Sequence, residues 1–381
     1  MKVTRLEVLR ASWFMWVKVH TDEGISGIGD LHGGSGGVGD PAAVRAGVEM
    51  CGDYLVGKDP LQVENHWQHM FRMCLFRGGA DLMAAIGSVD MALWDIAGKA
   101  AGLPVHRLLG GPVRDRVKVY GHLVGDSPEA MAENALSMKE KGFKALRFYP
   151  LGPFSEGVPD SYTGIVRRVV SFVEAVREAV GPDLDLMIDV VCRLTPPEAI
   201  AVGRAIEPYG LFFFEDPIEP DNIDVMAMVA ERQPVPIATG ERLYTIYQFR
   251  ELLNKKAAAY IRPDPSVSGG ITNLKKMAAQ AEAQYVGIVP HNPCTPVMTA
   301  ANLQICGAVH NVPVLEYTAN EHRSPKCDVV NRLPEFRDGF LMVPKGPGLG
   351  IELDEKALKR FPPERHSRAP VMAGDGSLRD Y

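Results

Sequence analysis

Short apolar runs alternate with helically spaced segments over the second part of the chain. Eight runs predict β-strands, at residues 117–121, 145–149, 184–189, 211–215, 236–240, 260–264, 286–291 and 312–317. Each is followed by a segment that can form a helix; residues 163–180, for example, place Ile165, Val169 and Val176 on one face. Strand–helix units repeated in this way are typical of a parallel (β/α)₈ barrel.

The first part of the chain has a different pattern. Residues 3–10, 14–20 and 25–30 form three short alternating runs, which predict an antiparallel meander. From about residue 41 to Gly102 the pattern is helical, and Gly102 followed by Pro104 ends it. The tail from about residue 330 has several prolines and no strong periodicity, and we expect it to pack on the N-terminal region.

Composition excludes several classes of protein. The 381 residues include 41 Lys and Arg against 47 Asp and Glu, a net charge of −6, which argues against a nucleic-acid partner. The six cysteines form no CxxC pair, so neither a disulfide framework nor a zinc motif is indicated, and a reducing cytoplasm is expected. No apolar stretch approaches the ~18 residues of a membrane span, so no membrane partner is expected.

Ionisable residues end seven of the eight predicted barrel strands. In such a barrel the functional groups lie at the C-terminal strand ends, where the loops converge. One acidic residue there could simply cap the next helix, but the whole set indicates a site. The set comprises Arg147 with Tyr149, Asp189, Glu215, Glu241, Asp264, His291 and Glu316.

Three of these carboxylates lie on consecutive strands. Asp189, Glu215 and Glu241 are separated by 26 and 26 residues, one strand–helix unit each. Neighbouring strands lie about 4.8 Å apart, so the three side chains should converge. Their mutual repulsion would force protonation unless a cation were bound. An all-oxygen site of this kind predicts Mg²⁺.

The next two strands end in Asp264 and His291, 27 residues apart. A carboxylate beside an imidazole fixes its tautomer and raises its basicity, which gives a general base. We therefore expect His291 to be the base and Asp264 its partner.

Several segments together resemble the enolase superfamily, in its mandelate racemase subgroup. They are SVDMALWDIAGKAAGLPVHRLLGG, MIDV, FFFEDP, TGERLY, IRPDPS, IVPHNP and VLEY. The resemblance covers nearly the whole chain. It implies a modified TIM barrel, (β/α)₇β, over residues 116–329, and an α+β capping domain over residues 1–115 that is completed by the tail 330–381.

The resemblance also implies roles for the strand-end residues. Asp189, Glu215 and Glu241 would bind Mg²⁺, and His291 with Asp264 would remove a proton next to a carboxylate. Glu316 would face the substrate carboxylate or the enediolate as a hydrogen-bonding acid. Reprotonation of the enediolate would give a racemase, whereas loss of a β-hydroxyl would give a dehydratase.

Departures from the racemase pattern narrow this choice. Racemases of the subgroup usually have Lys-x-Lys at the second strand end, where this chain has Arg147 and Tyr149. Arginine is a poor base, although it could lower the pKa of Tyr149. Proton removal from one face followed by elimination is therefore favoured. Some galactonate dehydratases carry a histidine acid where this chain has Val191, which argues against galactonate and leaves His291 or Tyr149 to protonate the leaving hydroxyl.

Three further histidines are candidate substrate contacts. His122 and His322 follow the first and last barrel strands, and His32 precedes a GxGxxG match at residues 34–39. The strands around this match form a meander, so we interpret it as a lid over the barrel mouth and not as a dinucleotide site.

The sequence thus predicts a Mg²⁺-dependent hydro-lyase that converts a sugar acid, an aldonate, to a 2-keto-3-deoxy acid. One alternative is a racemase or epimerase with Tyr149 as second base. Another is a catalytically silent member that binds sugar acids. We also expect a homo-oligomer.

Overall fold

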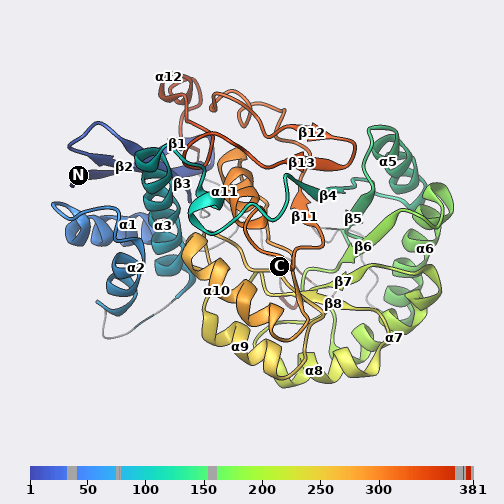
Figure 1. The fold of residues 1–381 in the computed structure, drawn as a ribbon. Coiled ribbons are helices and arrows are strands. Elements are labelled where there is room, and N and C mark those ends of the chain that lie inside the picture. Colours follow the sequence, from blue (N-terminus) through green and yellow to red (C-terminus); the bar gives the residue numbers. More distant parts are fainter. Residues whose placement is uncertain are drawn as a thin grey trace.

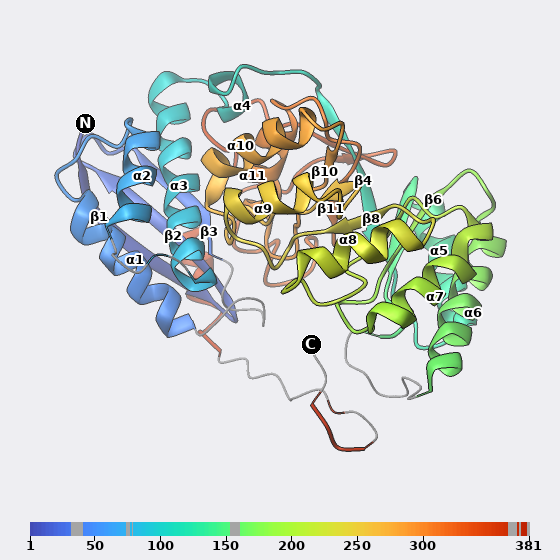
Figure 2. The ribbon, with the colours of Figure 1, turned by 90° about the horizontal axis from the view of Figure 1, so that it is seen from below.

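The computed structural model describes residues 1–31, 41–73, 77, 79–152, 161–364, 372 and 375–378. A small antiparallel sheet with its helices lies on one side, and a ring of parallel strands surrounded by helices lies on the other (Figures 1 and 2). Within the described residues, no helix combines the length and the apolar character needed to cross a bilayer.

The N-terminal part is an antiparallel sheet covered by helices. The strands, in the order β1-β2-β3, are β1 (Val3–Ala11), β2 (Phe14–Thr21) and β3 (Ser26–Asp30). The helices are α1 (Pro41–Leu55), α2 (Val63–Arg72), α3 (Ala80–Ala101) and α4 (Val105–Leu108). Helix α3 packs directly on β3 because Gly29 has no side chain: a Cβ there would lie 1.9 Å from the carbonyl oxygen of Ser88. The predicted meander is confirmed.

The parallel ring contains all eight predicted strands. They are β4 (Arg116–His122), β5 (Ala145–Phe148), β6 (Asp185–Asp189), β7 (Phe213–Glu215), β8 (Ile237–Thr239), β9 (Tyr260–Ile261), β10 (Gly287–Ile288) and β11 (Leu315–Tyr317). Strands β4 to β10 pair in chain order, and β11 pairs with β4. A buried cluster that includes Tyr120, Met187 and Phe213 contains residues of these strands.

Helices follow the first seven of these strands. They are α5 (Pro128–Glu140), α6 (Tyr162–Val180), α7 (Pro196–Ile206, extended by the 3₁₀ turn Glu207–Tyr209), α8 (Ile223–Arg232), α9 (Ile246–Asn254), α10 (Gly270–Glu282) and α11 (Pro296–Cys306). Ser127 caps α5 through its hydroxyl, and Thr195 and Glu198 form a capping box on α7.

The eighth strand has no barrel helix after it within the described residues. After β11 the chain forms turns, then the hairpin β12 (Phe336–Arg337) and β13 (Phe340–Met342), and later the one-turn helix α12 (Glu355–Leu358). The barrel is therefore of the (β/α)₇β type that the resemblance implies. The pattern-based expectation of a helix after every strand is wrong for the eighth, because residues 318–335 contain prolines and no apolar helical face.

The tail contacts both parts of the molecule. Strand β13 pairs antiparallel with β4, whereas the backbone of Ser12 exchanges hydrogen bonds with Phe361 (3.1 Å) and Glu364 (2.8 Å). Its assignment to the capping domain, and the boundary near residue 115, stay predictions.

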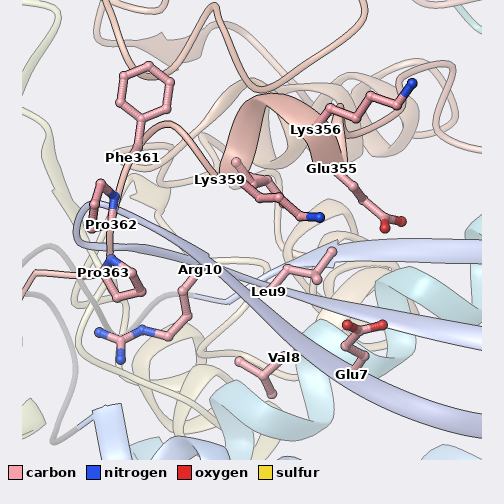
Figure 3. A pocket seen from close by; sticks show the side chains of 11 residues that line it. Glu7, Val8, Leu9, Arg10, Glu355, Lys356, Lys359, Phe361, Pro362 and Pro363 are labelled. Carbon is pink, nitrogen blue, oxygen red and sulfur yellow. The ribbon is translucent and has the colours of Figure 1, made fainter.

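A groove of about 730 Å³ lies between β1 and the tail (Figure 3). Its lining includes Arg10 of β1, Lys356 and Lys359 of the tail, and Phe361. None of the strand-end residues singled out from the sequence lines it, so the groove is separate from the candidate site.

Candidate active site

The strand ends bring the predicted residues to one end of the barrel. Asp189 and Glu215 are register partners at the ends of β6 and β7. Glu241 lies two residues beyond β8, whereas Asp264 and His291 follow β9 and β10 in short loops. Glu316 lies within β11, which pairs with β4. Spacing along the sequence becomes proximity here because parallel strands end at the same edge.

Four carboxylates make up the acidic part of the site. Glu215, Asp216 and Glu241 each offer an oxygen, and these atoms lie within 4.8 Å of one another. Asp189 lies beside them, where it accepts the backbone N–H of Val191 at 2.7 Å and pairs with Arg147. The sequence pattern predicts no role for Asp216, although its position directly after Glu215 in FFFEDP was a signal that could have indicated one.

Burial makes three of these carboxylates hard to ionise, whereas His291 and Arg262 outweigh burial at Glu241 and hold its pKa below the ordinary value. Burial raises the pKa of Asp189 to about 6, although Arg147 opposes the shift, and it raises the pKa of Asp216 to about 7. The pKa of Glu215 is also raised by burial, and its Oε2 has no hydrogen-bond partner among the described residues. A cation would relieve the repulsion and give that oxygen a partner. The all-oxygen set fits Mg²⁺.

Arg147 is a buried cation that lies between Asp189 and Glu215 on one side and Glu316 on the other. Its Nη1 pairs with Asp189 and lies 3.1 Å from Glu215 Oε1. Its Nη2 donates to the Tyr149 hydroxyl at 2.6 Å and lies 3.2 Å from Glu316 Oε1. Although burial opposes charge, these carboxylates hold the pKa of Arg147 well above its ordinary value. Arg147 therefore stays protonated and cannot serve as a base.

Tyr149 is also unsuited to the role of a base in this arrangement. Burial raises its pKa well above the ordinary value, and the opposing effect of Arg147 is smaller. The condition under which Tyr149 could act as a second base, a pKa lowered by Arg147, is therefore not met. Its phenol is a hydrogen-bonding group.

Arg262, in the segment IRPDPS, is a second buried arginine for which the sequence pattern predicts no role. Its side chain is 0% exposed. It lies 2.8 Å from Glu215 Oε1 through Nε and 2.7 Å from Glu316 Oε2 through Nη2. The signal in the sequence that could have indicated a role for Arg262 was a charged residue directly after an apolar strand.

Glu316 is surrounded by donors. Its Oε1 lies 2.9 Å from His122 Nε2, and its Oε2 accepts from Arg262 and, at 2.9 Å, from the backbone N–H of Asn292. Burial would raise the pKa of Glu316, but Arg262 and its other positive neighbours hold it well below the ordinary value. Glu316 is therefore a carboxylate acceptor here, which differs from the expected hydrogen-bonding acid.

His291 and Asp264 form the expected pair. His291 Nδ1 lies 2.9 Å from Asp264 Oδ2, and Nε2 faces Glu241 Oε2 at 3.4 Å. Asp264 is itself oriented, because its Oδ1 accepts the backbone N–H of Ser266 at 2.8 Å. Burial alone would lower the pKa of His291, but Glu241, Glu316 and Asp264 raise it to about 10. The imidazole thus lies between its partner and the acidic cluster.

The three candidate histidines differ in position. His122 belongs to the cluster, with burial lowering its pKa to about 4, so that it is neutral. His322 is exposed in the loop after β11. His32 and the glycine-rich segment 34–39 lie outside the described residues, so their predicted contact and lid roles stay predictions.

Comparisons with known proteins indicate the family of this chain. Residues 3–110 match the N-terminal domain model of mandelate racemase and muconate lactonizing enzyme, and residues 130–357 match the enolase C-terminal domain-like model. The chain is 38% identical to D-galactonate dehydratases of Xanthomonas oryzae pv. oryzae (strain PXO99A) and Variovorax paradoxus (strain S110), over 100% of each chain.

A solved structure is similar over its whole length. The crystal structure of an enolase from Agrobacterium radiobacter, bound to Na and L-malate, superposes with a TM-score of 0.92 at 30% identity and covers 100% of both chains. The fold, the strand-end groups and these matches lead to one conclusion. The chain belongs to the enolase superfamily, in its mandelate racemase subgroup.

Proposed function

We propose that this chain is a Mg²⁺-dependent acid-sugar dehydratase that converts an aldonate to a 2-keto-3-deoxy acid. The main observation is the contact between the candidate base and the acidic cluster. His291 Nε2 faces Glu241 Oε2 at 3.4 Å, so a base adjoins an all-oxygen cation site. The similarity to D-galactonate dehydratases supports a sugar acid as substrate.

Asp189, Glu215 and Glu241 would hold the cation. Bound there, Mg²⁺ would polarise the substrate carboxylate and stabilise negative charge as it develops. Asp216 is the alternative third ligand because its oxygen lies within the 4.8 Å group. It also accepts a hydrogen bond from the Thr239 hydroxyl, which gives it a structural partner that Glu215 Oε2 lacks.

Proton removal is assigned to His291. Without a cation, Glu241 and Glu316 raise the pKa of His291 to about 10; a cation held by Glu241 would offset that negative charge and lower the pKa. The neutral imidazole would then take the proton α to the substrate carboxylate at Nε2, while Asp264 accepts the Nδ1–H and stabilises the imidazolium that forms. Arg147 and Arg262 supply fixed positive charge in the same buried cluster, where such charge acts strongly on a developing anion.

Loss of water completes the reaction. The electron pair left at C2 forms the C2–C3 double bond as the C3–O bond breaks, and the departing hydroxide takes a proton from imidazolium His291 or from Tyr149. The resulting enol tautomerises to the 2-keto-3-deoxy acid. Neither Arg147 nor Tyr149 is a base in this arrangement, which favours elimination over two-faced proton transfer.

The choice of sugar acid is the open part of the proposal. D-galactonate is the first substrate to test because of the 38% identical relatives, even though Val191 replaces the histidine acid of some galactonate dehydratases. The test is incubation with a panel of aldonates and aldarates plus Mg²⁺ in D₂O. A 2-keto acid indicates a dehydratase, deuterium at C2 without elimination indicates an epimerase, and no exchange with any compound indicates a silent binder.

A further inference from the structure

We propose that Asn292 and Thr299 are positioning residues that fix Glu316 relative to His291. Neither belongs to the strand-end set, and both are buried, with 2% and 0% of their surface exposed. The inference rests on the function proposed above, since it concerns the geometry of the same site.

Asn292 joins the loop of the base to the strand of Glu316. Its backbone N–H donates to Glu316 Oε2 at 2.9 Å, and its side-chain Nδ2 donates to the Glu316 carbonyl oxygen at 2.9 Å. Because Asn292 directly follows His291, these two bonds tie the backbone that bears the base to both the main chain and the carboxylate of β11.

Thr299 in turn fixes the Asn292 side chain. Asn292 Nδ2 donates to Thr299 Oγ1 at 2.8 Å, and the Thr299 hydroxyl donates to a carboxylate oxygen of Glu321. Thr299 lies on α11, and Glu321 lies in the loop that follows β11 in place of an eighth barrel helix. The network therefore anchors the site to two elements outside the strand ends.

A neighbouring amide strengthens this arrangement. Asn302 Nδ2 donates to the His291 carbonyl oxygen at 3.2 Å and lies 3.3 Å from Asn292 Oδ1. The backbone of the base and the side chain that holds Glu316 are thus fixed from the same helix. A displacement of ~1 Å between reacting groups can cost roughly 10²-fold in rate, so such anchoring has catalytic consequences.

A role in general stability must be separated from positioning, and the chain offers a matched control. The buried hydroxyl of Thr272, on α10, donates to Asp90 Oδ1 at 2.5 Å. This is the same chemistry, a buried threonine bonded to a buried carboxylate, but Asp90 lies on α3 and belongs to none of the strand ends. Thr299→Val and Thr272→Val each remove one such hydroxyl with little change of shape.

The experiment compares Thr299→Val, Thr299→Ser and Thr272→Val in the full chain. Hydrogen exchange of the Asn292 amide is followed by NMR with isotopically labelled asparagine, alongside melting temperature, kcat and KM. We expect Thr299→Val to speed that exchange and to lower kcat about tenfold or more with KM nearly unchanged. Thr299→Ser should restore both, and Thr272→Val should lower only the melting temperature.

The exchange measurement keeps this test separate from the proposed function. If the wild-type protein converts no sugar acid, the proposed function fails. Hydrogen exchange of the Asn292 amide then tests by itself whether Thr299 positions Asn292 and Glu316. Faster exchange in Thr299→Val but not in Thr272→Val supports the inference. Wild-type exchange at Asn292 in folded Thr299→Val overturns it, whatever the activity.

Discussion

His291 Nδ1 lies 2.9 Å from Asp264 Oδ2, while the other ring nitrogen of His291 faces Glu241. The imidazole is therefore held by one carboxylate and directed toward the cluster that would bind the cation. A base in this position would act on a substrate bound at that cluster. Because the dyad and the cation ligands are different residues, each can be replaced and tested separately.

Replacing the base should abolish turnover without emptying the cation site. His291→Asn removes the group that accepts the α-proton, and general base catalysis is typically worth ~10²–10⁴-fold. We expect kcat to fall by at least that factor, while calorimetry still detects Mg²⁺ binding to a folded protein. Near-normal kcat on the identified substrate would exclude His291 as the base.

Removing one anionic ligand should weaken the binding of the cation. Glu215→Gln takes away a buried carboxylate whose Oε2 has no partner among the described residues. We expect Mg²⁺ affinity to fall more than tenfold, or over about 1.4 kcal/mol, by calorimetry.

The same titration distinguishes the two possible third ligands. Asp189→Asn should weaken Mg²⁺ binding as Glu215→Gln does, and Asp216→Asn should do so less. If Asp216→Asn weakened Mg²⁺ binding more than Asp189→Asn, Asp216 would be the third ligand in place of Asp189. Unchanged Mg²⁺ affinity in Glu215→Gln would mean that the cation does not bind at this cluster.

Mg²⁺ binding should depend on pH. Burial raises the pKa of Asp189 to about 6 and that of Asp216 to about 7, so without a cation each is protonated below its pKa. Because the cation binds the ionised forms, protons must be released on binding, and affinity should fall as pH drops from about 7 to below 6. Calorimetry in buffers of different ionisation enthalpy measures this release. Constant affinity with no proton release across that range would contradict the ligand assignment.

Tyr149 should act as a donor and not as a base. Tyr149→Phe removes the hydroxyl that accepts from Arg147 at 2.6 Å, but leaves the His291–Asp264 pair intact. In D₂O we expect elimination to slow while exchange of the α-proton continues without inversion at C2. Inversion in the wild-type protein would restore the racemase alternative, and loss of exchange in Tyr149→Phe would make the tyrosine the base.

The positions of the strands could be predicted from the sequence because each is a short apolar run between polar segments. The approach of Glu215 and Glu241 to within 4.8 Å followed, since parallel strands end at one edge, whereas Asp189 is not in that group and pairs with Arg147. The missing eighth helix did not follow from the repeating pattern. It follows from the local composition of residues 318–335, which contain prolines and no apolar helical face. The pairing of β13 with β4, between segments more than 200 residues apart, was likewise not predictable from the pattern.

The contacts among side chains were harder to foresee. Arg262 directly follows β9, in a segment whose pattern indicates burial, but only the structure shows that it bridges Glu215 and Glu316. The ionised state of Glu316 likewise depends on four donors from four different segments. Pattern and spacing locate the backbone of such a residue, whereas its charge depends on neighbours distant in the sequence.

We propose that the His291–Asp264 dyad and the acidic cluster together dehydrate a sugar acid. The most direct test is NMR of the wild-type protein incubated with D-galactonate, and then with the other aldonates, with Mg²⁺ and with a chelator. We expect a 2-keto-3-deoxy acid from at least one aldonate, formed with Mg²⁺ and not with the chelator. Recovery of every aldonate unchanged, or the same product rate in the chelator, would contradict it.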